Sequence, residues 1–110
     1  MEKDKMINKK EVYDVLILGA GPAGMTAGLY SARYARKTAI IGKEIGGVCM
    51  EGGDYENWPG TKKISGFELM QNFKEHVESY GVPIIAKKIT EIKKKGKLFV
   101  VKMGDEEILG

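Results

Sequence analysis

The chain has 110 residues, of which 43% are hydrophobic and 30% charged, with a formal net charge of +3 at pH 7. This length suits one domain with one hydrophobic core, and the near balance of charge gives no general case for a nucleic-acid partner. The most apolar stretch, residues 15–30, is short and interrupted by glycines and a proline, so we predict no membrane-spanning helix.

The first third of the chain predicts a strand–helix–strand unit. Residues 1–11 are polar and predict a tail, which precedes one domain over residues 12–110. The apolar run from Val12 to Leu18 predicts a strand buried on both faces, as in a parallel sheet. A helix is predicted from Pro22 to about Ala35, because proline fits a first helical turn. Residues 38–41 predict the second strand.

The rest of the chain predicts a loop, a helix and further strands. Residues 42–60 are rich in glycine and predict a long ordered loop. Ser65 and Glu68 form a capping-box pattern that begins a helix, and Gly81 ends it. Residues 84–92 and 98–102 predict strands joined by a turn, with a third strand starting at residue 108. The predicted fold class is α/β, a Rossmann-like domain with a parallel sheet and a hairpin or meander, incomplete at its C-terminus.

The segment Gly19-Ala20-Gly21-Pro22-Ala23-Gly24 is a G-x-G-x-x-G pattern between the first strand and the helix. In a dinucleotide site Gly19 allows the tight turn, Gly21 lets backbone amides approach a pyrophosphate, and Gly24 lets the helix lie close to the strand. The helix N-terminus then binds the phosphates through free N–H groups and its dipole. The alternative is a glycine-rich turn without a ligand.

A ribose-binding acid is expected about 20 residues after such a pattern. Glu44 is the candidate, although Gly42 and not Glu44 occupies the tip of the second predicted strand. A surface glutamate with no ligand is the competing interpretation.

Two segments of the loop identify a family. The string Glu56-Asn57-Trp58-Pro59-Gly60, together with residues 42–47 and the opening Y-D-V-x-I-x-G-A-G-P-A-G, resembles the thioredoxin reductase family of low-molecular-weight flavoproteins. The resemblance extends from Val12 to Leu109 and implies a Rossmann-like FAD-binding domain. The segment Val48-Cys49-Met50 departs from the family, in which polar residues are more usual.

The resemblance assigns roles to individual positions. It implies that the pyrophosphate contacts Gly21, Pro22, Ala23 and Gly24, and that the ribose contacts Lys43 and Glu44. It places Gly46 and Gly47 beside the flavin ring and the hydrogen-bonding amide of Asn57 near it. The backbone of Ile89 is expected close to the adenine. The competing interpretations are that Gly46 and Gly47 form a flexible loop tip and that Asn57 only orders a turn before Pro59.

The resemblance also implies an activity. In the family, NADPH reduces FAD, FAD reduces a C-x-x-C disulfide, and the dithiol passes electrons to thioredoxin. This chain has one cysteine, Cys49, and no second glycine pattern. We therefore expect the FAD-binding part of a disulfide oxidoreductase, with NADPH and the disulfide bound by the remainder of the reductase, a thioredoxin-like protein as substrate, and a homodimer when complete.

No residue of this chain is assigned a catalytic or metal-binding role. Cys49 lacks a resolving partner, so we expect a small buried hydrophobic residue and not a redox thiol. A single cysteine also favours a cytoplasmic protein. Two alternatives stay open: a related flavin enzyme without the disulfide, of the ferredoxin–NADP reductase type, and a non-catalytic nucleotide-binding domain.

We predict that these 110 residues alone hold FAD poorly. Without a later strand and helix, strand residues such as Ile40 and Val100 would keep an exposed neighbour or an unpaired edge. If ~200 Å² of apolar surface stays uncovered, the fold loses about 5 kcal/mol of hydrophobic stabilisation. The isolated chain should be partly aggregated or dimeric and mostly colourless, whereas a protein extended through the flavin domain should be yellow and monodisperse. Sedimentation and absorbance test both, and a monomeric, flavin-loaded 110-residue chain would contradict the prediction.

Overall fold

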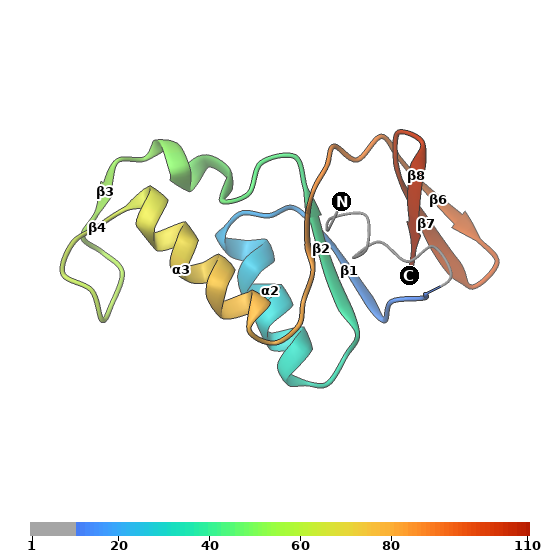
Figure 1. The fold of residues 1–110 in the computed structure, drawn as a ribbon, viewed down its shortest axis with the longest axis horizontal. Helices are drawn as coiled ribbons and strands as arrows, with labels where there is room; N and C mark the ends of the chain where they lie inside the picture. Colours follow the sequence, from blue (N-terminus) through green and yellow to red (C-terminus); the bar gives the residue numbers. More distant parts are fainter. Residues whose placement is uncertain (1–10) are drawn as a thin grey trace.

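The computed structural model describes residues 11–110, which form three layers (Figure 1). Two helices lie on one side of a parallel sheet, and an antiparallel sheet lies on the other side. The predicted tail lies outside the described residues except for Glu11, whose carboxylate is 2.9 Å from the Lys37 ammonium. Of residues 11–110, no helix is both long and apolar enough to cross a membrane.

The parallel sheet has the strand order β1-β2-β5. Its strands are β1 (Val15–Leu18), β2 (Thr38–Gly42) and β5 (Ile84–Ala86), and both pairings are parallel. All five residues of the central strand β2 are buried. The helix between β1 and β2 completes the predicted βαβ unit, which is thereby confirmed.

The two helices begin and end for identifiable reasons. Helix α2 (Pro22–Arg33) starts with proline in its first turn and ends two residues before Ala35, which has a φ of 60° and cannot continue a right-handed helix. Helix α3 (Gly66–Glu78) is capped by Ser65, whose hydroxyl accepts a 3.1 Å hydrogen bond from the Glu68 amide. The predicted N-cap at Ser65 is confirmed, but the Glu68 carboxylate accepts from the Ser65 hydroxyl, at 3.4 Å, and not from the Ser65 backbone amide as a complete capping box requires.

The antiparallel sheet has the order β6-β7-β8. It consists of β6 (Glu91–Lys95), β7 (Leu98–Met103) and β8 (Glu106–Leu109). The prediction of one strand over residues 84–92 was wrong, because the chain leaves the parallel sheet after Ala86 and crosses to the other layer before β6 begins. Backbone pairing with β2 ends at Ala86, and pairing with β7 begins at Glu91.

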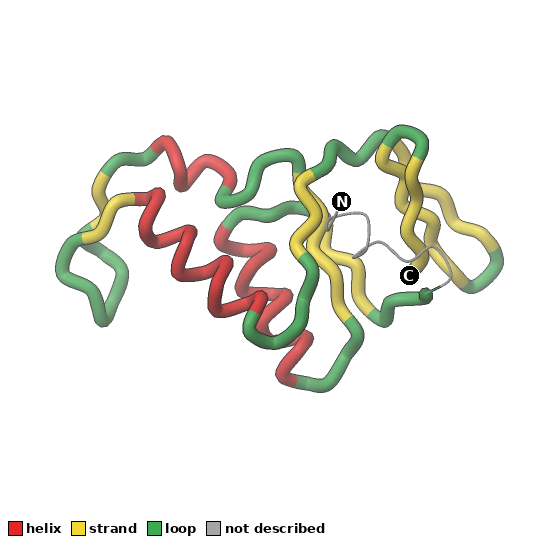
Figure 2. Tube along the Cα trace, in the orientation of Figure 1, coloured by secondary structure: helices red, strands yellow, loops and turns green. Residues whose placement is uncertain are grey.

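Residues of β2 divide the core into two clusters. Ala39 and Ile41 face the antiparallel sheet and pack with residues of β5, β7 and β8, whereas Ile40 faces the helices. Figure 2 shows the same three layers by element type. Because strand side chains alternate between faces, a strand covered on both sides is mainly apolar, and in β2 the one polar side chain, Thr38, is hydrogen-bonded through its hydroxyl to Ser31 and to the Arg36 carbonyl.

The edges of the parallel sheet differ from the prediction. β1 is an edge strand, and its Leu18 side chain is 41% exposed, so the strand is not buried on both faces. Ile40 and Val100, which were expected beside uncovered surface, are 0% and 6% exposed. Both lie on the central strand of their sheet, so neither borders an unpaired edge, whereas Val100 does keep an exposed neighbour, because Phe99 is 49% exposed.

The predicted loop of residues 42–60 contains two short elements. A 3-10 helix, η1 (Gly47–Glu51), follows β2, and β3 (Asp54–Tyr55) pairs with β4 (Ile64–Ser65). The loop is therefore ordered, as predicted, and it lies against the N-terminal part of α3 (Figure 1).

Replacement of the α3 cap should lower stability. Ser65→Ala removes the hydroxyl that accepts the Glu68 amide bond, and we expect the free energy of unfolding to fall by about 1 kcal/mol. Urea unfolding of the full-length protein, followed by far-UV circular dichroism, measures the change. Thr26→Ala is the control, because the Thr26 hydroxyl only bonds back to the Pro22 carbonyl, and its effect should stay within about 0.5 kcal/mol.

Candidate nucleotide site

The glycine turn between β1 and α2 is held by one steric contact. A Cβ placed on Gly24 would lie 1.9 Å from the carbonyl oxygen of Gly19, so no side chain fits at that position. Gly19 itself has a φ of 129°, and its amide donates a 2.7 Å hydrogen bond to the Ile41 carbonyl on β2. The turn is thus fixed to the end of the central strand.

The N-terminus of α2 presents unpaired backbone donors. Gly21 is the N-cap residue, it provides no side-chain cap, and the first turn carries no acidic residue. Pro22 has no amide hydrogen, whereas the amides of Ala23 and Gly24 belong to the first turn, where N–H groups lack partners within the helix. This end of the helix is suited to an anion.

Among residues 11–110, nothing in the backbone conformation or in the surroundings of Gly21 requires glycine at that position. Its φ of −86° is accessible to any residue, and a Cβ there would meet nothing closer than the Gly46 carbonyl oxygen, at 4.0 Å. The space beside Gly21 is therefore available to a bound group, which distinguishes Gly21 from Gly24.

A second glycine segment closes against the first. The Gly46 amide donates a 2.7 Å hydrogen bond to the Ala20 carbonyl, and a Cβ on Gly47 would lie 3.3 Å from the Gly21 Cα. Gly46 and Gly47 have φ values of 97° and 58°, which favour glycine at both positions. The two glycine segments are far apart in the sequence and lie together in the fold.

Sequence patterns missed the residues that join these two segments. Ala20 is 4% exposed, and a Cβ on Gly42 would lie 2.8 Å from both the Cβ and the amide nitrogen of Ala20. Gly42 is therefore required at the end of β2 for close packing of the turn. The signal was present in the sequence as a glycine at the strand tip, where an acid was expected.

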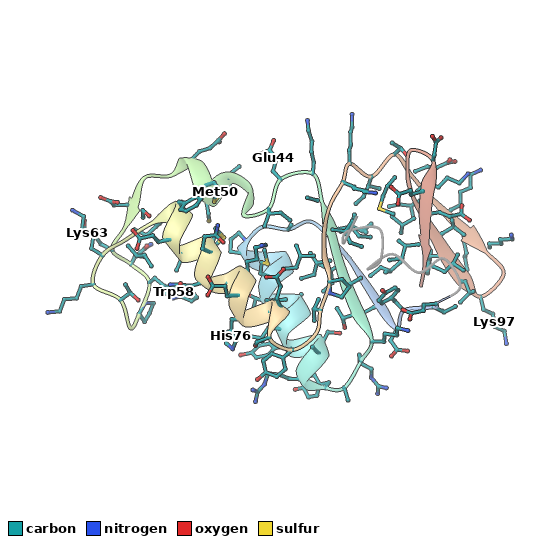
Figure 3. The ribbon with its side chains drawn as sticks, viewed as in Figure 1. Glu44, Met50, Trp58, Lys63, His76 and Lys97 are labelled. Carbon is teal, nitrogen blue, oxygen red and sulfur yellow. The ribbon has the colours of Figure 1, made fainter. Side chains whose placement is uncertain are left out.

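Lys43 and Glu44 follow β2 directly, and both are exposed. In Figure 3 the Glu44 side chain projects away from the body of the molecule, above the segment that joins β2 to η1. Because β1, β2 and β5 are parallel, the glycine turn, Lys43 and Glu44, and the segment containing Ile89 all follow the carboxyl edge of one sheet. Ligands of open α/β sheets bind at this edge.

The side chain of Ile89 lies on the side of the parallel sheet away from α2. It is half-buried and packs against the cluster between the parallel and antiparallel sheets. Its position after β5 puts it at the carboxyl edge, but its side chain belongs to the other layer from α2.

Asn57 lines a pocket of about 220 Å³ between the loop and α3. The pocket brings Asn57 together with Pro22 of the glycine turn and with Cys49 of η1. Trp58 secures this loop, because its ring packs on Phe73 of α3 with ring centroids 5.3 Å apart (Figure 3). The other residues that line the pocket are Tyr55, Trp58, Leu69, Met70 and Phe73.

Cys49 is half-buried, not fully buried as expected, and it forms no disulfide. The Tyr55 hydroxyl donates to the Cys49 carbonyl over 3.5 Å. Hydrogen bonding to Cys49, and to a lesser extent burial, raises the pKa of the Tyr55 phenol above its usual range. Val48 beside it is 80% exposed, which leaves an apolar side chain uncovered next to Gly47.

A glycine turn at the carboxyl edge of a parallel sheet, leading into a helix with free N-terminal amides, defines a dinucleotide-binding domain of the Rossmann type. The family profile described as pyridine nucleotide-disulphide oxidoreductase matches residues 13–109. The chain belongs to the pyridine nucleotide-disulphide oxidoreductase family.

Individual relatives agree with this assignment. A component of the alkyl hydroperoxide reductase of Escherichia coli is 42% identical over 79 residues, which are 72% of this chain and 15% of that protein. Thioredoxin reductase of Borreliella burgdorferi is 41% identical over 104 residues, 90% of this chain and 32% of that protein. The crystal structure of Lactococcus lactis thioredoxin reductase superposes with a TM-score of 0.82 and 37% identity, over 88% of this chain and 32% of that one.

The predicted resemblance to thioredoxin reductases and the predicted fold class are thereby confirmed. The chain spans about a third of the length of the thioredoxin reductases that it matches.

Alanine substitutions should separate the two glycines of the turn. Gly24→Ala forces the Gly19 carbonyl away and should lower the free energy of unfolding by roughly 2 kcal/mol. Gly21→Ala meets open space and should cost less than about 1 kcal/mol, the difference between glycine and alanine at an N-cap. Urea unfolding of both variants of the full-length protein measures the two values, and equal losses would show that the turn is packed differently.

Proposed function

We propose that this chain is the FAD-binding part of a thioredoxin-reductase-like flavoprotein. The observation that carries the proposal is the space beside Gly21, which nothing in residues 11–110 fills and which adjoins the free amides of α2. A pyrophosphate fits this donor set, because the amides supply hydrogen bonds and the helix dipole supplies positive potential without a lysine.

The remaining predicted residues extend the site in two directions from the pyrophosphate. Lys43 and Glu44 follow β2 and would bind the adenosine ribose, with the backbone of Ile89 beside the adenine. Gly46 and Gly47 would lie against the flavin, since they are within contact of Gly21 and carry no side chains. Asn57 would donate to or accept from the flavin ring, because it shares a pocket with Pro22.

When bound, FAD accepts a hydride and passes on electrons as a pair or singly. The residues of this chain would hold and orient it and would exclude water from one side. No cysteine pair lies in the chain, so the disulfide that receives electrons belongs to the remainder of the reductase. Cys49 then acts as a packing residue at the pocket wall and not as a redox thiol.

We further propose NADPH as the electron donor and a thioredoxin-like protein as the substrate of the complete reductase, a cytoplasmic homodimer. The support is family membership and the similarity to thioredoxin reductases. A ferredoxin-type flavin enzyme without the disulfide and a non-catalytic nucleotide-binding domain are the alternatives. A yellow protein with flavin absorbance excludes the second, and a C-x-x-C pair in the full-length sequence excludes the first.

Gly21→Ala should reduce FAD retention in the full-length protein. The added methyl group fills the space in which a pyrophosphate would lie, so we expect at least about a tenfold loss of affinity, while the far-UV circular dichroism stays unchanged. Flavin absorbance after gel filtration measures retention. Ala27→Ser, which adds one atom to the exposed side of the same helix, should keep its flavin, and equal flavin content in Gly21→Ala and the parent would refute the pyrophosphate assignment.

A further inference from the structure

The hairpin formed by β6 and β7 carries a concentration of positive charge. Residues 87–97 contain six lysines and one glutamate. Every residue of β6 is exposed, and Lys97 lies in the turn at the outer end of the hairpin (Figure 3). Lys93 pairs with Glu91 at 3.4 Å, whereas Lys94 and Lys95 have no carboxylate within ion-pair distance among the residues that the structure describes.

The outer edge of β6 also offers unpaired backbone groups. Phe99 of β7 exchanges two hydrogen bonds with Gly110, of 2.6 and 3.0 Å, so its backbone points toward the β8 side. Lys94 lies directly opposite Phe99, and in an antiparallel ladder such a pair turns both backbones away from each other. The N–H and C=O groups of Lys94, and of Ile92 two residues before it, therefore point to the open side of the sheet.

Apolar side chains accompany these groups on one face of the hairpin. Ile92 and Phe99 share a face with Lys94, and they are 53% and 49% exposed. Lys93 and Lys95 lie on the opposite face, because strand side chains alternate. An added strand would thus meet Lys93, Lys95 and the Glu91 that pairs with Lys93 on one face, and a mainly apolar surface on the other.

We propose that the outer edge of β6 binds an extended, acidic segment of a partner protein, which adds to the sheet as a further strand. The backbone groups of Ile92 and Lys94 would supply main-chain hydrogen bonds, and the lysines would select acidic side chains. A second copy of the chain is disfavoured at this edge, because pairing of β6 with itself would set lysines opposite lysines.

The arrangement suits a polypeptide and not a nucleic acid or a membrane surface. Phosphate backbones and lipid headgroups require cations gathered on one face, since affinity for them comes from the number of charges neutralised. Here the lysines divide between two faces, and a row of free backbone groups lies between them. Binding at this edge goes beyond the proposed FAD site and does not depend on it.

The test uses the full-length protein and a peptide of about ten residues that alternates glutamate with valine. About ten residues is the upper end of the usual length of one strand. Binding is followed by fluorescence anisotropy. A second peptide has the same sequence but is N-methylated at alternate positions along its pairing edge, so it keeps every charge and loses the hydrogen bonds. A single-stranded oligonucleotide of equal charge is the third ligand.

We expect the parent protein to bind the first peptide at least about tenfold more tightly than the N-methylated peptide and the oligonucleotide. Lys94→Glu/Lys95→Glu should weaken peptide binding by a further factor of about ten, whereas Lys62→Glu/Lys63→Glu, the matched pair on the loop before α3, should change it less than about twofold. Circular dichroism confirms that both variants fold.

Amide hydrogen exchange gives the sharpest readout. On peptide binding, the amides of Ile92 and Lys94 should gain protection, while that of Lys93, which already faces β7, should not change. Equal binding of the N-methylated peptide, tighter binding of the oligonucleotide, or self-association through β6 in sedimentation would each overturn the proposal.

Discussion

The contact between the Gly24 backbone and the Gly19 carbonyl is the constraint on which the rest of the structure depends. Because no side chain separates them, α2 begins directly at the end of β1, and its free amides lie at the carboxyl edge of the sheet. The same close packing lets Ala20 rest on Gly42 and lets the Gly46 amide reach the Ala20 carbonyl at 2.7 Å. The loop after β2 is therefore positioned by the turn after β1, and a candidate cofactor site is formed between them.

Many of the helices and strands were predictable from the sequence, because at these places local patterns and tertiary packing agree. Three local patterns each specify an element without contacts from the rest of the chain. They are the apolar run before Gly19, the proline in the first turn of α2, and Ser65 with Glu68 at the start of α3. The pattern of glycines also indicated which residues approach one another. Its physical basis differs between positions, however, since Gly24 is required by packing inside the chain and Gly21 is not.

What the sequence could not show is how the strands divide between sheets. Residues 84–92 have no break strong enough to separate β5 from β6, because Lys87 and Lys88 suit an exposed strand as well as a crossing. The edge position of β1 and the pocket that joins Asn57 to Pro22 depend on contacts between residues far apart in the chain. Such contacts leave no periodic signal in the sequence, so the way in which these segments assemble could not be predicted from it.

The relatives of this chain carry the names of different reductases. One relative named for alkyl hydroperoxide and another named for thioredoxin are 42% and 41% identical to the chain, over 72% and 90% of its length. A glycine turn of this kind is compatible with several functions, because a fold does not by itself fix a reaction. Exposed surface can vary without loss of the turn, and the strand addition proposed at the β6 edge uses such a surface. The lysine-bearing edge of β6 lies in the antiparallel sheet, on the opposite side of the parallel sheet from α2.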